Sequence, residues 1–182
     1  MNFIELILLS IALAMDTFAV SICISLSRIK KSIKTVIIPP AYFGVFQAGM
    51  PLIGFILASL FTVYIVQYSS WIAFIILAFI GGKMIYGSFK ADDSLLKKDN
   101  ILSPAFLLPL AIATSIDALA VGVSFAALET NIILAVMLIG SMTFIIASMG
   151  ILLGSLIGIR FKSKAEILGG IVLVLIGIRI LI

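Results

Sequence analysis

Histidine is absent from this chain of 182 residues, cysteine occurs only once, and charged residues fill 11% of the positions. The single cysteine, Cys23, excludes a disulfide within the chain. Because zinc, copper and nickel usually recruit imidazole or thiolate ligands, this composition disfavours a site for those ions. The phosphate-binding pattern G-x-x-x-x-G-K-[ST] is missing as well, so the sequence gives no indication of ATP hydrolysis.

Apolar residues dominate what is present. They occupy 63% of the positions, whereas a soluble globular domain averages about 45–50% apolar and about 25% charged residues. Such a chain cannot build a water-facing surface, so we expect an integral membrane protein embedded in a lipid bilayer. The N-terminal MNFIE lacks the basic stretch and cleavage site of a signal peptide, so the first apolar segment is expected to remain as a helix.

Six apolar segments are each long enough to cross a bilayer, which takes about 20 residues per helix. They lack the alternation of apolar and polar residues that is typical of barrel strands. The sequence therefore predicts an all-α integral membrane protein with six transmembrane helices. The predicted helices span residues 3–26, 36–60, 68–88, 103–127, 131–158 and 165–182.

Lysine and arginine occupy only alternate connections between these segments. Ten of them lie in the first, third and fifth connections, and none lies in the second or fourth. Because cytoplasmic loops of membrane proteins are enriched in Lys and Arg, we expect both termini outside and a multi-pass protein of the cytoplasmic membrane. The net charge of +4 is thus explained by membrane orientation, and we expect no nucleic-acid partner.

The two halves of the chain resemble each other. ALAMDTFAVSI at 12–22 matches ATSIDALAVGV at 113–123 with an offset of 101, and the segments around Gly44 and Gly140 match with an offset of 96. Three helices in each half would insert the second half upside down, as in inverted-repeat transporters. The predicted units are a first repeat at 1–88, a cytoplasmic linker at 89–102 and an inverted repeat at 103–182.

Each half carries one aspartate near the centre of its first helix. Asp16 and Asp117 are repeat mates. Asp16 lies 13 residues after Phe3 and 12 before Arg28, and Asp117 lies 14 residues after Ser103 and 12 before Glu129. An ionised carboxylate at this depth costs about 2.5–3.5 kcal/mol, which favours a functional role over a structural hydrogen bond between helices. Two carboxylates without histidine or thiolate ligands indicate a hard divalent cation such as Mg²⁺, Mn²⁺ or Ca²⁺.

Other oxygen atoms in the predicted helices extend this candidate metal site. Gln47 and its repeat mate Thr143 lie in the second helix of each half, and Ser115 lies two residues before Asp117. Proline at position 51 has no N–H, so the main-chain oxygen of Gln47 loses its helical donor and is free to bind another group. An interhelical hydrogen bond is the alternative interpretation of Gln47.

Lys83 and Arg179 are the only cations within the predicted spans, and they are also repeat mates. They could serve as counter-charges for the acidic site when it is empty. The alternative is that their long side chains extend to the membrane boundary, where the charged head reaches water.

Five stretches carry a resemblance to a known family: MDTFAVSI, FGVFQAGMPLIG, WIAFIILAFIGGKMI, AIATSIDALAVGVSF and KAEILGG. Over essentially its whole length the sequence resembles the bacterial manganese efflux pump family of the lysine-exporter superfamily. The resemblance implies export of Mn²⁺ as the transported substrate, with Asp16 and Asp117 at the positions on which the family depends. Thr17 stands where the family often has alanine, and Gln47 stands where some relatives carry an acid.

Export of a dication against the membrane potential requires energy, about twice 2.3 kcal/mol per 100 mV. We therefore expect an antiporter that exchanges protons for Mn²⁺ at the two aspartates, with no cofactor and no enzymatic activity. The alternatives are an exporter of another divalent cation or of an amino acid, an intramembrane aspartyl protease, and a non-transporting assembly protein. The protease would require Gly-x-Gly-Asp, but Met15 and Ile116 precede the aspartates. The oligomeric state stays open, a homo-oligomer included.

Overall fold

The computed structural model describes residues 2–26, 32–59, 69–87, 102–128, 130–157, 167 and 171–180. Within these ranges, all regular secondary structure is helical. The helices are α1 (Phe3–Leu26), α2 (Ile33–Ser59), α4 (Ser69–Gly87), α5 (Pro104–Ala127), α6 (Ile132–Ile157) and a shorter one, Ile171–Ile180, which we call the C-terminal helix. Within the described residues, the prediction of an all-helical chain is confirmed, with six helices, of which four are long and apolar enough to cross a membrane.

The ends of the first five helices agree with the predicted segments to within three residues. The predicted sixth segment, 165–182, is described as a helix over Ile171–Ile180. Of the ten basic residues on which the predicted orientation depends, only Lys34 is described, in the first turn of α2, and the others lie outside the described residues. The predicted linker at 89–102 also lies outside them, apart from residue 102.

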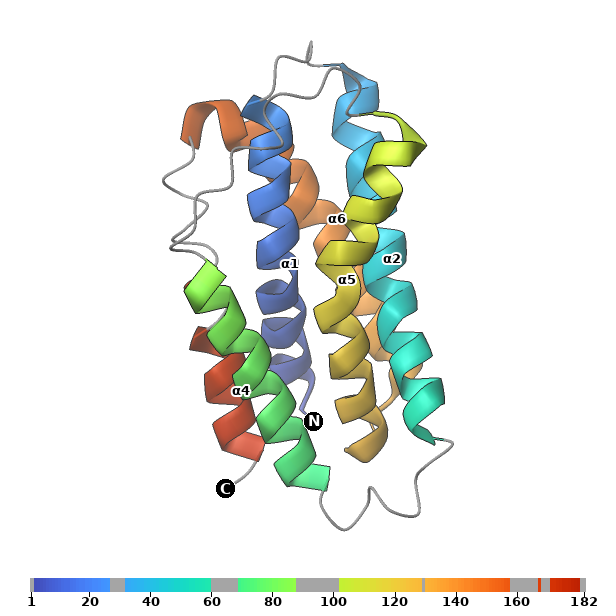
Figure 1. Ribbon diagram of the computed structural model, residues 1–182, viewed down its shortest axis with the longest axis vertical. Coiled ribbons are helices and arrows are strands. Elements are labelled where there is room, and N and C mark those ends of the chain that lie inside the picture. The colour runs from blue at the N-terminus through green and yellow to red at the C-terminus, as the bar shows by residue number, and fades with distance from the viewer. Residues whose placement is uncertain are drawn as a thin grey trace.

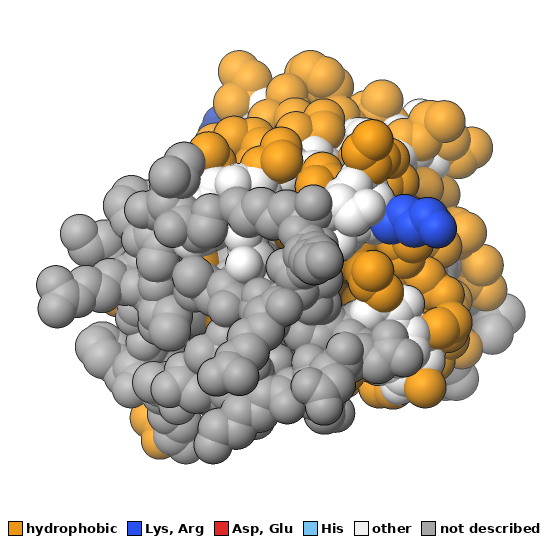
Figure 2. Space-filling model, turned by 90° about the horizontal axis from the view of Figure 1, so that it is seen from above, with side chains coloured by type: hydrophobic (Ala, Val, Ile, Leu, Met, Phe, Trp, Pro, Cys, Tyr) orange, Lys and Arg blue, Asp and Glu red, His pale blue; other side chains and the backbone are white. Residues whose placement is uncertain are grey.

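Four of the described helices, α1, α2, α5 and α6, are long and apolar enough to cross a membrane. Their apolar spans contain 23 to 27 residues, which at about 1.5 Å per residue exceed the roughly 30 Å of a hydrocarbon core. Figure 2 shows hydrophobic side chains over much of the described surface at one end of the molecule. These are the features of a multi-pass membrane protein.

Helix α2 continues through three prolines, Pro39, Pro40 and Pro51, all of which are buried. In water such prolines would end a helix, because each removes a hydrogen-bond donor and crowds the preceding turn. In lipid there is no competing water, and neighbouring helices can satisfy the freed groups. The helix therefore remains continuous, and Gln47 stays in register with the rest of it.

Helices from opposite halves of the chain pack against one another in pairs (Figure 1). The two most extensive contacts join α1 to α6 and α2 to α5, and a third joins α2 to α6. Contact between α1 and α5 is much smaller. The C-terminal helix packs on α4, where Gly177 faces Phe74 and Leu77, and it ends at the same end of the bundle at which α1 begins.

The buried apolar side chains form two clusters. The larger one combines the first half of α1 with the second half of α5, the first half of α6, α4 and the C-terminal helix. The smaller one combines Ile24 of α1 with Phe43 of α2, Ala111 of α5 and two residues of α6. The polar residues near the middle of α1 and α5 therefore lie between the two apolar clusters.

Glycines allow α2 and α6 to cross closely. A Cβ atom on Gly44 would lie 3.0 Å from the carbonyl oxygen of Gly140, and one on Gly140 would lie 3.1 Å from the carbonyl oxygen of Gly44. At such distances any larger side chain would force the two backbones apart. The crossing fixes how α2 and α6 present Gln47 and Thr143, which lie three residues further along each helix.

Candidate functional site

Asp16 lies near the middle of α1 and Asp117 near the middle of α5, and both are half-buried. The Oδ1 atom of Asp16 accepts a hydrogen bond from the backbone N–H of Thr17 at 2.7 Å, and the hydroxyl of Thr17 lies 3.5 Å from the same atom. Thr17 also donates to the carbonyl oxygen of Ala14 at 3.1 Å. The neighbouring threonine thus helps to orient the Asp16 carboxylate, a contribution that the sequence analysis missed.

Gln47 connects α2 to α1 close to Asp16. Its side chain is fully buried, and its amide nitrogen donates to the carbonyl oxygen of Leu13 at 3.1 Å. Leu13 lies three residues before Asp16, so the amide reaches α1 within one turn of the aspartate. The interhelical hydrogen bond is therefore present, yet the Oε1 atom of Gln47 is buried and finds no hydrogen-bond partner among the described residues.

Thr143 has the same property on α6. Its side chain is fully buried, and its hydroxyl oxygen has no hydrogen-bond partner within the part of the chain that the structure describes. Helical threonines commonly bond back to a carbonyl one turn earlier, as Thr114 does. Leaving a buried polar atom unpaired costs about 1–3 kcal/mol. Gln47 and Thr143 thus each have a buried side-chain oxygen atom that no described residue hydrogen-bonds.

Ser115 differs from these two residues. It is fully buried, and its hydroxyl donates to the carbonyl oxygen of Ala111 at 2.7 Å. The neighbouring Thr114 donates to the carbonyl oxygens of Leu110 and Ala111 at 3.0 and 3.1 Å. Both hydroxyl protons are therefore used within α5, although the hydroxyl oxygens still have lone pairs that can accept.

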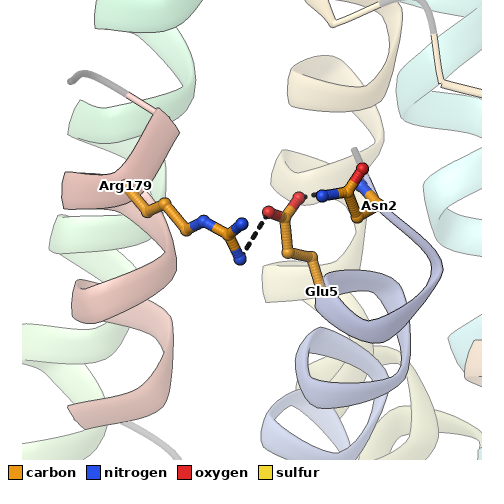
Figure 3. A network of polar contacts seen from close by, with 3 residues as sticks. All are labelled: Asn2, Glu5 and Arg179. Carbon is orange, nitrogen blue, oxygen red and sulfur yellow. Dashed lines mark hydrogen bonds and ion pairs between the residues drawn. The ribbon is translucent and has the colours of Figure 1, made fainter.

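Arg179 in the C-terminal helix forms an ion pair with a residue that the sequence analysis did not consider (Figure 3). Its Nη1 atom lies 2.7 Å from Oε1 of Glu5, whose side chain is only 11% exposed, whereas that of Arg179 is 64% exposed. The second oxygen of Glu5 accepts the backbone N–H of Asn2 at 2.9 Å. The guanidinium thus has its carboxylate partner near the start of α1.

Glu5 precedes Asp16 by eleven residues, about 16 Å along the helix. A counter-charge role of Arg179 at the aspartates stays a prediction, and the side chain of Lys83 lies outside the described part of the structure. One signal in the sequence could have indicated the pair: Glu5 is the only acidic residue besides Asp16 in the first predicted span.

The described residues contain no group of three or more His, Cys, Asp and Glu side chains that could hold a metal ion. What they offer is a carboxylate on each of α1 and α5 together with an amide oxygen on α2 and a hydroxyl oxygen on α6. Such oxygen donors suit a hard dication.

Comparison with known proteins finds similar sequences over the length of the chain. A family model described as "Putative manganese efflux pump" matches residues 30–181. The putative manganese efflux pump MntP of Acetivibrio thermocellus is 45% identical over 181 residues, which cover 100% of this chain and 91% of that protein. A protein named putative manganese efflux pump MntP 2, from Clostridium botulinum strain Langeland, is 47% identical over 191 residues. The match covers 100% of this chain and 95% of that protein.

A similar protein from Clostridium perfringens strain 13, also named putative manganese efflux pump MntP, is 43% identical over 204 residues, with 100% of this chain and 95% of that protein covered. No solved structure matches the chain. Identity at this level over complete chains is far beyond what shared apolar composition produces. The resemblance found in the sequence motifs is confirmed, and this chain belongs to the manganese efflux pump family.

Proposed function

We propose that this protein is a secondary transporter that exports Mn²⁺ from the cytoplasm across the cytoplasmic membrane. The observation that carries the proposal is the match, over the whole chain, to relatives named manganese efflux pumps. The chemistry agrees, because carboxylate, amide and hydroxyl oxygens suit Mn²⁺. The same relatives favour transport over the protease and the assembly protein that the sequence alone leaves open.

In this proposal Asp16 and Asp117 bind one Mn²⁺ between them. Their two negative charges balance the charge of the ion, and Gln47 and Thr143 add neutral oxygen ligands. The buried, unpartnered state of the Gln47 Oε1 and Thr143 Oγ1 atoms supports this assignment. Ser115 supplies a further oxygen through its remaining lone pairs. Mn²⁺ favours octahedral oxygen coordination, so water molecules complete its shell.

We further propose that the site lies between two inverted repeats, residues 1–88 and 103–182, joined by a cytoplasmic linker. A two-fold axis relating them would exchange α1 with α5 and α2 with α6. It would then map the α1–α6 contact onto the α5–α2 contact, and these are the two most extensive contacts in the bundle. The α2–α6 crossing would lie on the axis itself.

Individual contacts support the same relation. The two glycines of the α2–α6 crossing, Gly44 and Gly140, are repeat mates, and each approaches the carbonyl oxygen of the other. In a second pair of contacts, Gly150 of α6 faces the carbonyl oxygen of Phe18, and its mate Gly54 of α2 faces that of Leu119. Phe18 and Leu119 differ by the offset of 101 found between the aspartates, so the contacts obey the sequence repeat.

The proposed orientation has both termini outside the cell. It rests on the ten basic residues of the first, third and fifth connections. In Figure 1 the start of α1 and the end of the C-terminal helix lie at the same end of the bundle, as an even number of membrane crossings requires. Ions would then enter the site from the end opposite to the two termini.

Proton exchange is the proposed source of energy. Moving Mn²⁺ out against 100 mV costs about 4.6 kcal/mol, twice the cost for one elementary charge. Exchange for two protons removes this electrical cost, because no net charge moves. Each pH unit of gradient then contributes about 2.7 kcal/mol, twice the 1.36 kcal/mol for one proton. Asp16 and Asp117 release their protons to the cytoplasm when Mn²⁺ binds and take up protons outside when it leaves.

The substrate is tested in bacteria that lack their own Mn²⁺ exporters. Expression of this chain should lower the cellular manganese content and restore growth in medium with added Mn²⁺, while magnesium and calcium contents stay unchanged. An unchanged manganese content would contradict the proposal. A simultaneous fall in one amino acid would instead identify an amino-acid exporter.

The coupling ion is tested with purified protein in vesicles loaded with Mn²⁺. An inward proton gradient should accelerate Mn²⁺ release, and a protonophore should remove the acceleration. Release that does not respond to the gradient would exclude proton exchange and leave the Mn²⁺ assignment intact.

A further inference from the structure

Three hydroxyl groups follow Asp16 along one face of α1. Thr17, Ser21 and Ser25 are spaced four residues apart, so they lie above one another on the helix. Thr17 and Ser21 are fully buried. Under the proposed orientation this face leads from Asp16 towards the cytoplasmic end of α1.

Two of these hydroxyls have no hydrogen-bond partner. The Oγ atoms of Ser21 and Ser25 are buried and unpaired among the residues that the structure describes. Four other serines in the described helices bond back to the carbonyl oxygen four residues earlier. Ser10, Ser115, Ser141 and Ser148 do so at 2.7 to 2.8 Å. Ser21 and Ser25 thus leave their hydroxyls unpaired among the described residues, as Ser124 of α5 also does.

Both side chains face glycines of α6. A Cβ atom on Gly150 would lie 2.8 Å from Cβ of Ser21, and one on Gly154 would lie 2.7 Å from Cβ of Ser25 and 3.1 Å from its Oγ atom. We call Ser21, Ser25, Gly150 and Gly154 the serine seam. At this distance the two helices are in direct contact, and the seam is closed in this conformation.

Packing alone does not account for the hydroxyls of the serine seam. Alanine would make the same Cβ contacts with Gly150 and Gly154 without the penalty of an unpaired buried polar atom. The matching positions of the second half, at the offset of 101, are Gly122 and Ala126, which have no hydroxyl. Close packing is thus common to both halves, whereas the hydroxyls belong to one end of the molecule.

We propose that Ser21 and Ser25 are the first protein ligands that Mn²⁺ meets on its way from the cytoplasm to Asp16. When α1 and α6 separate, their hydroxyl oxygens replace part of the hydration shell of the ion in two steps. Successive hydroxyls are about 6 Å apart along the helix, too far for one ion to bind both at once, so the ion keeps water ligands as it moves from one to the next. This inference rests on the proposed export function and on its orientation.

The test measures initial rates of Mn²⁺ uptake into everted membrane vesicles, whose cytoplasmic face is outside. Ser21→Ala and Ser25→Ala should each raise the Mn²⁺ concentration for half-maximal rate by about three- to tenfold, the range expected for losing one hydrogen-bonding group. The maximal rate should change little, because Asp16 and Asp117 are intact. Ser124→Ala is the matched control, since it removes a buried, unpaired hydroxyl from the end of α5 beyond Asp117.

A second set of variants separates the hydroxyl from packing. Ser21→Gly combined with Gly150→Ser moves the hydroxyl across the seam and should restore the half-maximal concentration to within about twofold of the wild type. Ser21→Gly combined with Gly150→Ala restores the volume without the hydroxyl and should remain impaired. The amount of each variant in the membrane is measured in parallel, so that rates are compared per molecule.

The outcomes distinguish this inference from the proposed function. Wild-type uptake that is lost in Asp16→Asn but unchanged in the combined Ser21→Ala, Ser25→Ala variant would overturn the role of the seam and leave Mn²⁺ export standing. Equal rescue by Gly150→Ser and Gly150→Ala would also overturn it, because volume alone would then suffice. Absence of Mn²⁺ uptake by the wild type would overturn both.

Discussion

The polar contacts described near the two aspartates differ, although each aspartate lies on a helix with one extensive packing partner, α6 for α1 and α2 for α5. Near Asp16, the Thr17 N–H and hydroxyl approach the carboxylate, and the amide of Gln47 reaches α1 at Leu13. Near Asp117, the hydroxyl protons of Ser115 and Thr114 are used by carbonyl oxygens of α5 itself. The helix pairing is similar on the two sides, whereas these hydrogen bonds of the neighbouring side chains differ.

Under the proposed function, this difference would distinguish the cytoplasmic side from the outer side of a nearly symmetric bundle. In the proposed inverted repeat, packing contacts common to both halves would set the geometry of the bundle, and polar groups that differ between the halves would distinguish its two sides. Substitutions in the frame should therefore have similar effects in both halves, whereas substitutions of polar groups should not.

The largest effect is expected from removing either carboxylate. Asp16→Asn and Asp117→Asn should each abolish Mn²⁺ efflux, because a neutral amide cannot balance the charge of the ion or exchange a proton. The measurement is the manganese content of expressing cells, and Ser10→Ala, whose hydroxyl bonds only to the carbonyl of Leu6, is the control. Efflux that survives in one of the two variants would break the equivalence of the aspartates.

A smaller and unequal effect is expected from the neutral ligands. Gln47→Leu should lower the Mn²⁺ transport efficiency more than Thr143→Val. It removes the proposed ligand atom Oε1 and also the hydrogen bond from the side-chain amide to the carbonyl oxygen of Leu13. We expect roughly tenfold or more for Gln47→Leu, equivalent to about 1.4 kcal/mol, and a few-fold for Thr143→Val. Transport rates in vesicles at several Mn²⁺ concentrations provide the comparison. Equal losses would argue that the two positions are interchangeable.

Substitutions of glycines test the packing between the helices. Gly54→Ala and Gly150→Ala place a Cβ atom against a backbone carbonyl of the neighbouring helix, so both should destabilise the folded protein, by about 1–3 kcal/mol. Gly49→Ala on α2 meets nothing within 4 Å and should be neutral or stabilising by up to about 1 kcal/mol. Thermal unfolding in detergent measures the three variants. A stable Gly54→Ala beside an unstable Gly150→Ala would contradict the symmetry of the frame.

The smallest effect is expected at the Glu5–Arg179 ion pair. It has no counterpart in the other half, where the position equivalent to Glu5 is Phe106. Because Arg179 is largely exposed, Glu5→Gln should cost at most about 1 kcal/mol of stability, and less in high salt. Thermal unfolding at low and high salt tests this. A loss of efflux as complete as that of Asp16→Asn would show that the pair belongs to the transport pathway.

Much of the fold could be predicted because lipid imposes a simple rule on sequence. Long apolar segments bounded by polar connections must be helices, and the first five helices end within three residues of the predicted positions. Helix α2 illustrates the limit of local rules, since its three internal prolines would indicate breaks in a soluble protein.

The residues of the candidate site could be singled out from the sequence, but the contacts between helices around them could not. The sequence singles out the aspartates by their depth and their repeat, and Gln47 and Thr143 by their positions as mates, and their joint binding of Mn²⁺ stays a prediction. Glu5, the ion-pair partner of Arg179, is 174 residues away along the chain, and no periodic pattern in the sequence links the two positions. The unpaired hydroxyls of the serine seam likewise depend on which helix faces α1, which the sequence does not encode in any short motif.

Binding of Mn²⁺ to the purified protein tests most directly whether both halves contribute to one site. Electron paramagnetic resonance of free Mn²⁺ during titration gives the number of ions bound per chain. We predict one ion for the wild type and none, at the same concentration, for either Asp16→Asn or Asp117→Asn. One ion retained by each single variant would mean that the carboxylates act independently, and would contradict a shared site.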